Sequence, residues 1–99
     1  MARLIVWSVR AAEDLEGIAG YIAQDSEIYS GSVVRTILQK TRVLAEFPYI
    51  GRIVPEFNEE PIREIFAYSY RIIYKVDDNE VLIAAIVHGK RILDIALRA

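Results

Sequence analysis

Cysteine is absent from this 99-residue chain, and histidine occurs once, as His88. Without thiols the chain can form neither disulfides nor thiolate zinc sites, and it has no cysteine nucleophile. One histidine cannot build a multi-histidine metal centre. We therefore expect a protein that works without a metal or another cofactor.

Long hydrophobic runs are absent as well. The longest, from Val81 to Val87, has seven residues, whereas a membrane-spanning helix needs about 20. No signal peptide is visible, because Arg3 and Arg10 bracket only a short apolar segment. These features predict a soluble, cytoplasmic protein that has no membrane partner.

An excess of positive charge is also missing. The chain has 12 Lys and Arg against 14 Asp and Glu, for a formal net charge of −2, and residues 13–27 hold five acids and no base. Proteins that grip the phosphates of RNA or DNA usually carry clustered Lys and Arg. Direct nucleic-acid binding is therefore not expected to be the main source of affinity.

What the chain does have is a full share of apolar residues, 54%, which predicts one folded domain over residues 1–99. Two apolar stripes with helical spacing occupy its first half. Ser8 can cap the first helix, which should end near Gln24, and Ser26 can cap a second that continues to Ala45. Two amphipathic helices with a brief connection predict an antiparallel helical hairpin.

Strand-like segments flank this hairpin. The first is Arg3–Trp7, and three more follow a loop at 47–61 that contains all three prolines: Ile62–Ala67, Tyr70–Val76 and Glu80–Val87. The short gaps between the last three predict an antiparallel meander, and the last of them is apolar on both faces, as in a central strand. Lys90–Arg98 predicts a short final helix.

The predicted fold class is therefore α+β, with a helical hairpin packed on an antiparallel sheet. The order is β-α-α-β-β-β with a short C-terminal helix. The first strand must pair with the meander, because the sequence offers no other sheet.

Four stretches of the chain carry a resemblance to known proteins. They are AAEDLEGIAGYIA (Ala11 to Ala23), LAEFPYIGRIVPE (Leu44 to Glu56), YRIIYKV (Tyr70 to Val76) and VHGKR (Val87 to Arg91). In this order and spacing they resemble the RelE/ParE superfamily of bacterial toxins from type II toxin–antitoxin systems. The first two look most like the ParE branch.

The resemblance implies a ParE-like toxin that inhibits DNA gyrase by binding it rather than as an enzyme. It further implies growth inhibition, plasmid stabilisation, and neutralisation by a cognate antitoxin of the ParD or RelB type. DNA gyrase and a homodimer of the free chain are the other partners that we expect.

Two alternatives stay open at this point. RelE-like members of the superfamily cut mRNA in the ribosome, and Arg71 and Arg91 match positions where they carry phosphate-binding arginines; His88 is a candidate general base. However, the last eight residues, Ile92 to Ala99, have neither the Tyr nor the His that such toxins use for proton transfer. The other alternative is an inactive toxin-fold binding module.

The candidate site residues also have plain structural interpretations. Arg71 can occupy the solvent face of the sheet and pair with Glu64 or Glu80, and His88 can be a structural hydrogen-bonding group at a strand end. Gly51 and Arg52 can form a turn with an exposed arginine. Tyr70 and Tyr74 are more typical of core or rim aromatics than of catalytic phenols.

The apolar C-terminal segment favours a protein partner. It is hydrophobic on nearly every side of the predicted final helix, and the mean hydropathy of the chain is +0.23. A terminal helix of this kind cannot bury every face in one small core. We therefore expect part of an antitoxin to contact Ile92, Leu93, Ile95 and Leu97.

Overall fold

The computed structural model describes residues 2–90. Its element order is β1 (Leu4–Trp7), α1 (Val9–Ala23), α2 (Glu27–Val43), β2 (Arg52–Ile53), β3 (Ile62–Ala67), β4 (Tyr70–Val76) and β5 (Glu80–His88). The predicted final helix, beyond its first residue Lys90, lies outside the described residues. Within residues 2–90, no helix combines the length and the apolar character that crossing a membrane requires.

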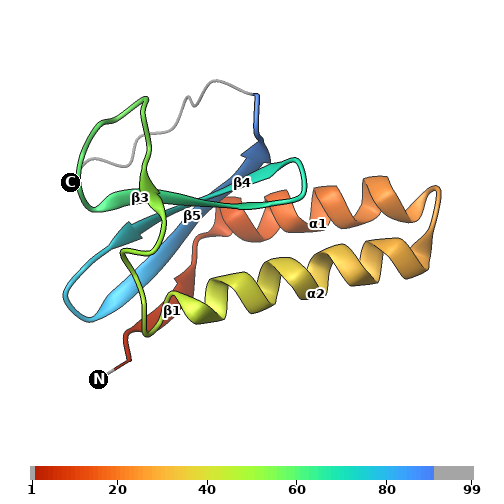
Figure 1. Cartoon of the computed structure of the whole chain (residues 1–99). Helices are drawn as coiled ribbons and strands as arrows, with labels where there is room; N and C mark the ends of the chain where they lie inside the picture. The colour runs from red at the N-terminus through yellow and green to blue at the C-terminus, as the bar shows by residue number, and fades with distance from the viewer. Residues whose placement is uncertain (1, 91–99) are drawn as a thin grey trace.

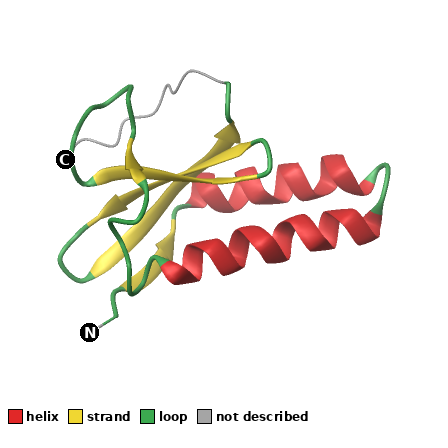
Figure 2. Cartoon of the chain, viewed as in Figure 1, coloured by secondary structure: helices red, strands yellow, loops and turns green. Residues whose placement is uncertain are grey.

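Both helices begin at the predicted serine caps. The hydroxyl of Ser8 accepts a hydrogen bond from the backbone N–H of Ala11 at 3.0 Å, and that of Ser26 accepts one from Tyr29 at 3.1 Å. Each bond satisfies a backbone N–H that the first helical turn would leave without a partner. The two helices run side by side on one face of the sheet, as Figure 2 shows, and the predicted hairpin is confirmed.

The sheet has five strands within the described residues, in the order β1-β5-β4-β3-β2. β3, β4 and β5 form the predicted antiparallel meander. The first strand pairs with the meander, as expected, but in parallel with β5, so the sheet is mixed rather than antiparallel throughout. Two helices and three strands separate β1 from β5, so the connection allows either orientation, and residue patterns do not choose between them.

The segment 47–61 was expected to be entirely loop, but it contains the short edge strand β2, which pairs antiparallel with β3. Two residues are too few to show an alternating pattern. In β2, Arg52 lies opposite Glu64, with which it forms a hydrogen bond, and Ile53 lies opposite Arg63.

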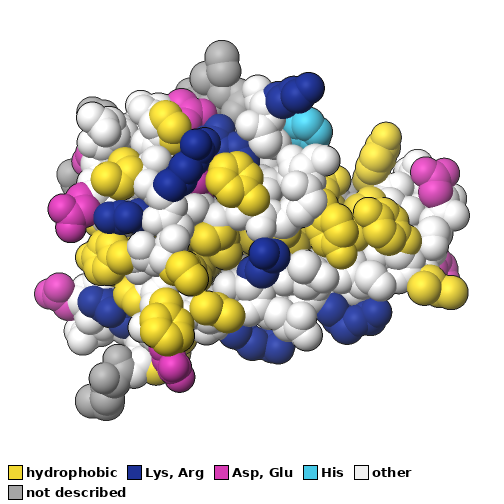
Figure 3. Space-filling view, viewed as in Figure 1, with side chains coloured by type: hydrophobic (Ala, Val, Ile, Leu, Met, Phe, Trp, Pro, Cys, Tyr) yellow, Lys and Arg dark blue, Asp and Glu magenta, His cyan; other side chains and the backbone are white. Residues whose placement is uncertain are grey.

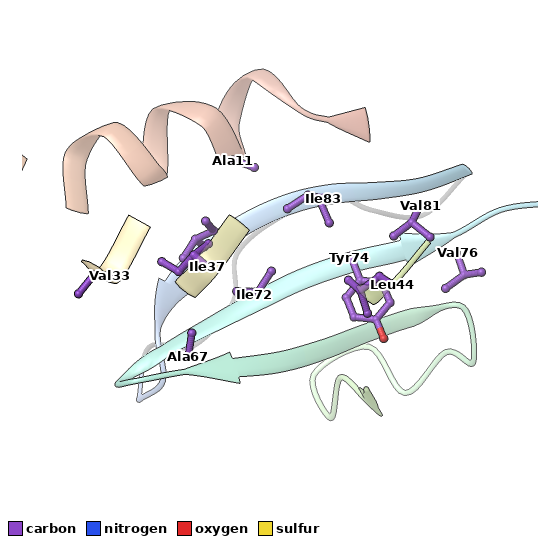
Figure 4. Packing of buried hydrophobic residues seen from close by; sticks show 11 residues of the cluster. Ala11, Val33, Ile37, Leu44, Ala67, Ile72, Tyr74, Val76, Val81 and Ile83 are labelled. Atoms are coloured by element: carbon purple, nitrogen blue, oxygen red, sulfur yellow. The ribbon is translucent and has the colours of Figure 1, made fainter. Parts of the chain in front are cut away.

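Hydrophobic side chains cover both faces of the sheet. On the helix face, Ile37 and Leu44 of the α2 side pack against Ile72, Tyr74 and Ile83 of the sheet (Figure 4). On the other face a smaller cluster contains Val54, Ile62, Ile73, Ala85 and Val87, with Phe57 packed against it. β4 and β5 are thus covered on both sides, and the prediction of a central strand at Val81–Val87 is confirmed.

Candidate functional site

Arg71 lies on β4 and points to the sheet face away from the helices. Its Nε donates to Oε1 of Glu64 at 2.6 Å, and its Nη1 and Nη2 donate to the two carboxylate oxygens of Glu56 at 2.7 and 2.8 Å. The pairing with Glu64 was predicted, but the expectation of a solvent-facing arginine is wrong, because only 5% of the side chain is exposed. The segment that follows β2 brings Val54, Glu56 and Phe57 over this face.

Glu64 is shared between two arginines. Its carboxylate has no exposed surface, and its Oε2 accepts a hydrogen bond from Nε of Arg52, whose own side chain is 60% exposed. Arg52 also lies over the ring of Phe66, with 5.2 Å from its guanidinium carbon to the ring centroid. Arg52, Glu56, Glu64 and Arg71 therefore form a charge-balanced group, which we call the Arg–Glu cluster.

The electrostatics of the cluster keep Arg71 charged. The hydrogen bond to Glu56 has the largest effect and raises the pKa of Arg71, burial opposes it, and Glu64 raises the pKa further. Bidentate pairs of this kind are among the strongest hydrogen bonds in proteins. Three of the five N–H groups of this guanidinium donate to carboxylates, and only 5% of the side chain is exposed, so little of Arg71 is accessible to a phosphate.

His88 stands at the exposed end of β5. Its Nδ1 accepts a weak hydrogen bond from the backbone N–H of Lys90 at 3.4 Å, and its ring meets that of Tyr70 edge-on, with centroids 6.3 Å apart. Tyr70 packs with the helix-face core, whereas Val87 and its strand partner Arg71 lie on the other face. The structure therefore does not bring Arg71 and His88 together.

The remaining predicted site residues are all C-terminal. Arg91, Ile92, Leu93, Ile95 and Leu97 lie outside the described residues. Among residues 2–90, no group of three or more His, Cys, Asp or Glu side chains could hold a metal ion.

Tyr74 fixes the segment that presents Arg52. From the centre of β4 its hydroxyl donates to the backbone carbonyl of Pro48 at 2.7 Å and accepts from the backbone N–H of Gly51 at 3.0 Å. A Cβ on Gly51 would lie 2.5 Å from both this hydroxyl and the carbonyl oxygen of Glu64, so only glycine fits. Burial raises the pKa of Tyr74, and the bond to Gly51 opposes the shift.

Sequence reasoning placed Tyr74 correctly among core or rim aromatics but missed this anchoring role. The available signal was a tyrosine on an apolar central strand, since a buried hydroxyl needs a hydrogen-bond partner. Arg52 is exposed, as expected. However, it belongs to strand β2 rather than to a turn, and it forms a hydrogen bond with Glu64.

Two adjoining hollows surround His88. The first, of about 320 Å³, lies between α1 and the end of β5 and includes Asp14, Gly17, Tyr21, Ile86 and His88 in its lining. The second, of about 350 Å³, lies between the hairpin and the β3–β4 turn. It shares Tyr21, Tyr70 and His88 with the first and adds Tyr29 and Tyr68.

Aromatic side chains dominate the second hollow. The rings of Tyr29 and Tyr68 meet edge-on, with centroids 6.1 Å apart, although each residue is about half exposed. Figure 3 shows hydrophobic side chains gathered over the helical hairpin beside the histidine. Sequence reasoning missed this surface, because its tyrosines come from α1, α2 and the β3–β4 hairpin, which only the fold brings together.

Comparison with solved structures shows the fold. A chain of the chromosomal ParDE toxin–antitoxin system of P. aeruginosa superposes with a TM-score of 0.73 at 18% identity, covering 90% of this chain and 98% of that one. A chain of the toxin–antitoxin complex RelBE2 from Mycobacterium tuberculosis gives 0.64 at 17% identity, covering 89% and 99%. The YoeB dimer of Staphylococcus aureus gives 0.60 at 21% identity, covering 86% and 94%.

Sequence comparison shows the family. No curated protein matches the chain significantly. The family model described as the ParE toxin of the type II toxin–antitoxin system parDE matches residues 5–93, which is most of the chain. The protein therefore belongs to the ParE toxin family of type II toxin–antitoxin systems.

Proposed function

We propose that this ParE-type toxin inhibits DNA gyrase by binding to it, without chemistry of its own, and that a cognate antitoxin neutralises it. The observation that supports binding without catalysis is that the guanidinium of Arg71 donates its hydrogen bonds to two carboxylates. Cleavage of RNA through its 2′-hydroxyl needs a proton acceptor near cations that stabilise the charged phosphorus transition state. Here the donors of Arg71 meet carboxylates, and His88 stands on the opposite face.

The charge of the chain supports the same proposal. The Arg–Glu cluster contributes no net positive charge to its sheet face, and the formal charge of the whole chain is −2. A toxin that docks on ribosomal RNA would gain affinity from clustered cations. A toxin that binds a protein target does not need them.

The test uses purified gyrase and relaxed plasmid DNA. Supercoiling should fall at micromolar toxin, and cleaved plasmid should accumulate if the toxin traps a covalent gyrase–DNA complex. Adding the antitoxin encoded in the neighbouring reading frame should restore supercoiling. Unchanged supercoiling together with no trapped complex would reject gyrase as the target.

A parallel experiment addresses the ribosome. Primer extension on translated mRNA, after induction of the toxin, should show no new 5′ ends. New ends that disappear in a His88→Ala variant would favour the endonuclease alternative, and His88 suits this test because its side chain is exposed. Induction without any growth defect would favour the inactive binding module.

Two expected contacts belong to this proposal. The antitoxin is expected to contact the C-terminal residues 92–97, and the free chain is expected to form a homodimer. Size-exclusion chromatography with light scattering, on the toxin alone and with its antitoxin, measures both the oligomeric state and the stoichiometry of the complex.

A further inference from the structure

A group of exposed hydrophobic side chains lies at the end of α2 and on the segment that leads through β2. Its members, each 36–64% exposed, are Val43, Phe47, Tyr49, Ile50 and Ile53. Figure 3 shows hydrophobic side chains gathered over this part of the molecule, with Lys and Arg side chains among them. Single exposed apolar residues are normal on a protein surface, but a contiguous group indicates a binding surface. We call these five residues the α2-end surface.

Short backbone contacts hold the members of this surface together. The N–H of Phe47 donates to the carbonyl of Val43 at 3.0 Å, and the N–H of Ile50 donates to the carbonyl of Phe47 at 3.2 Å. A hollow of about 320 Å³ includes Arg42, Val43 and Phe47 in its lining. The α2-end surface therefore has a concave part into which a side chain of another protein could fit.

Buried neighbours fix the segment on the domain. Leu44 and Val54, on either side of it, have no exposed surface. Between them, the hydroxyl of Tyr74 bonds to the backbone of Pro48 and Gly51. The exposed side chains thus stand on a backbone that is already ordered. A partner that binds here would not have to order this segment, which lowers the entropic cost of binding.

Arg63 adds a positive charge that is held in place. From β3, its Nη1 donates to the carbonyl of Gly51 at 3.1 Å and its Nε donates to the carbonyl of Glu60 at 2.7 Å. Its guanidinium carbon lies 5.0 Å from the ring centroid of Tyr49. Both acceptors are backbone carbonyls, so these bonds orient the guanidinium without neutralising its charge.

Arg42 brings a second cation to the same surface. It is exposed in the last turn of α2, and among residues 2–90 neither Arg42 nor Arg63 forms an ion pair. The only acid in the sequence 42–53 is Glu46. A partner that covers this surface should therefore present Asp or Glu around an apolar centre, because complementary charges favour association.

The charges disfavour two other occupants. In a symmetric dimer the same patch of both copies forms the interface, so the arginines of both copies would meet, with only Glu46 of each copy among them. A strand of RNA or DNA would gain little affinity from so few cations. A different protein with an acidic border around an apolar surface fits best.

We propose that the α2-end surface is the face with which this toxin binds gyrase, and that the contacted gyrase surface has an apolar centre bordered by Asp and Glu. Aromatic residues and arginine often contribute most of the binding energy at protein interfaces, and this face offers Phe47, Tyr49 and Arg63. The inference rests on the proposed function, because it takes gyrase to be the target.

Ile50 and Ile28 provide a matched pair of variants. Both are exposed isoleucines, at 64% and 85%, but Ile28 lies at the start of α2, roughly 22 Å along the helix from its end. Ile50→Asp should raise the toxin concentration that halves gyrase supercoiling by at least about tenfold, because it places an acid against the acidic border. Ile28→Asp should leave this concentration within about twofold. Circular dichroism of the full-length variants should show native folding for both.

A second pair tests the charge. Arg42 and Arg35 are both exposed on α2 and lie two turns apart on one side of the helix. Arg42→Glu should weaken binding to immobilised gyrase, and more at low salt than at high salt. Arg35→Glu, which lies farther from the α2-end surface, should have a smaller effect.

Three results would overturn the inference. Ile50→Asp that inhibits gyrase as strongly as the wild type would show that gyrase binds elsewhere. Equal losses in Ile50→Asp and Ile28→Asp would show an effect of added negative charge rather than of this surface. Ile50→Asp that binds the antitoxin more weakly but inhibits gyrase normally would assign the surface to the antitoxin. If the wild type itself does not inhibit gyrase, the proposed function fails as well, so the two failures are distinguishable.

Discussion

At the scale of single residues, the hydroxyl of Tyr74 holds the segment that precedes β2. Tyr74→Phe removes the hydroxyl that donates to the carbonyl of Pro48 and accepts from the N–H of Gly51. Both of these hydrogen bonds are then lost. We expect the free energy of unfolding in urea to fall by about 1–3 kcal/mol. Tyr49→Phe is the control, because that ring is half exposed, and it should change stability by less than about 0.5 kcal/mol.

The burial of Tyr74 also predicts that the free energy of unfolding falls at alkaline pH. Burial raises the pKa of Tyr74 above its ordinary value of 10.0. Above about pH 10 the unfolded chain therefore releases the Tyr74 proton while the folded chain retains it, so stability falls as pH rises; below pH 10 the contribution is complete. Urea unfolding between pH 8 and 11 should show this fall, and Tyr74→Phe should lessen it. An equal fall in both proteins would contradict the assignment.

Two arginines that bond to the same carboxylate should contribute very differently to the free energy of unfolding. Arg71 is buried and Arg52 is mostly exposed, yet both donate to Glu64. Arg71→Met leaves Glu64 buried with one exposed partner, and we expect a cost of about 3–5 kcal/mol. Arg52→Met should cost less, about 1 kcal/mol, because the Arg52 side chain is 60% exposed and Arg71 still neutralises Glu64. Similar losses for the two variants, measured by urea unfolding, would contradict the burial argument.

The sequence identified Glu64 as a partner of Arg71 but not Glu56. Cross-strand pairing follows from the meander, since Glu64 and Arg71 lie on neighbouring strands. Glu56 reaches Arg71 from an irregular segment, and no residue pattern fixes the path of such a segment. For the same reason the burial of Arg71 could not be predicted, because that segment provides the cover.

At the scale of elements, two glycines of α1 and the glycine before β2 should respond in opposite ways to alanine. Gly17 and Gly20 lie inside α1 with open space around them, so each change to alanine should stabilise the protein by about 0.5–1 kcal/mol. Gly51→Ala should destabilise it, because the new Cβ would lie 2.5 Å from the backbone of Glu64. Thermal unfolding by circular dichroism checks all three, and a loss of stability in Gly17→Ala would show that α1 is more crowded there.

The helices were more predictable than the sheet. Serine caps and apolar stripes act within a few residues, and the structure bears them out at Ser8 and Ser26. Sheet pairing depends on distant residues: the parallel orientation of β1, the strand β2, and a register shift between Ile73 and Tyr74 are all set by tertiary contacts. That register decides the faces of Arg71 and His88, so their separation could not be read from the sequence.

At the scale of the whole molecule, the two hydrophobic clusters share one sheet. Side chains of β4 point alternately into the helix-side core and into the cluster beneath the Arg–Glu group, as Ile72 and Ile73 do. Neither layer can open without exposing strands that the other layer needs. We therefore expect the chain to unfold in a single cooperative transition, as most domains of this size do.

Trp7 allows this cooperativity to be measured across the sheet. It is the one tryptophan of the chain, it lies on β1, and it packs against the helix-face core, whereas Arg71 lies on the other face. In Arg71→Met, the urea midpoint reported by Trp7 fluorescence should fall by the same amount as the midpoint reported by far-ultraviolet circular dichroism. A Trp7 midpoint that stays at its wild-type value while the circular dichroism midpoint falls would show that the two faces unfold separately. The Arg–Glu cluster would then stabilise only the cover of its own face, whereas coincident midpoints would make it part of the stability of the entire domain.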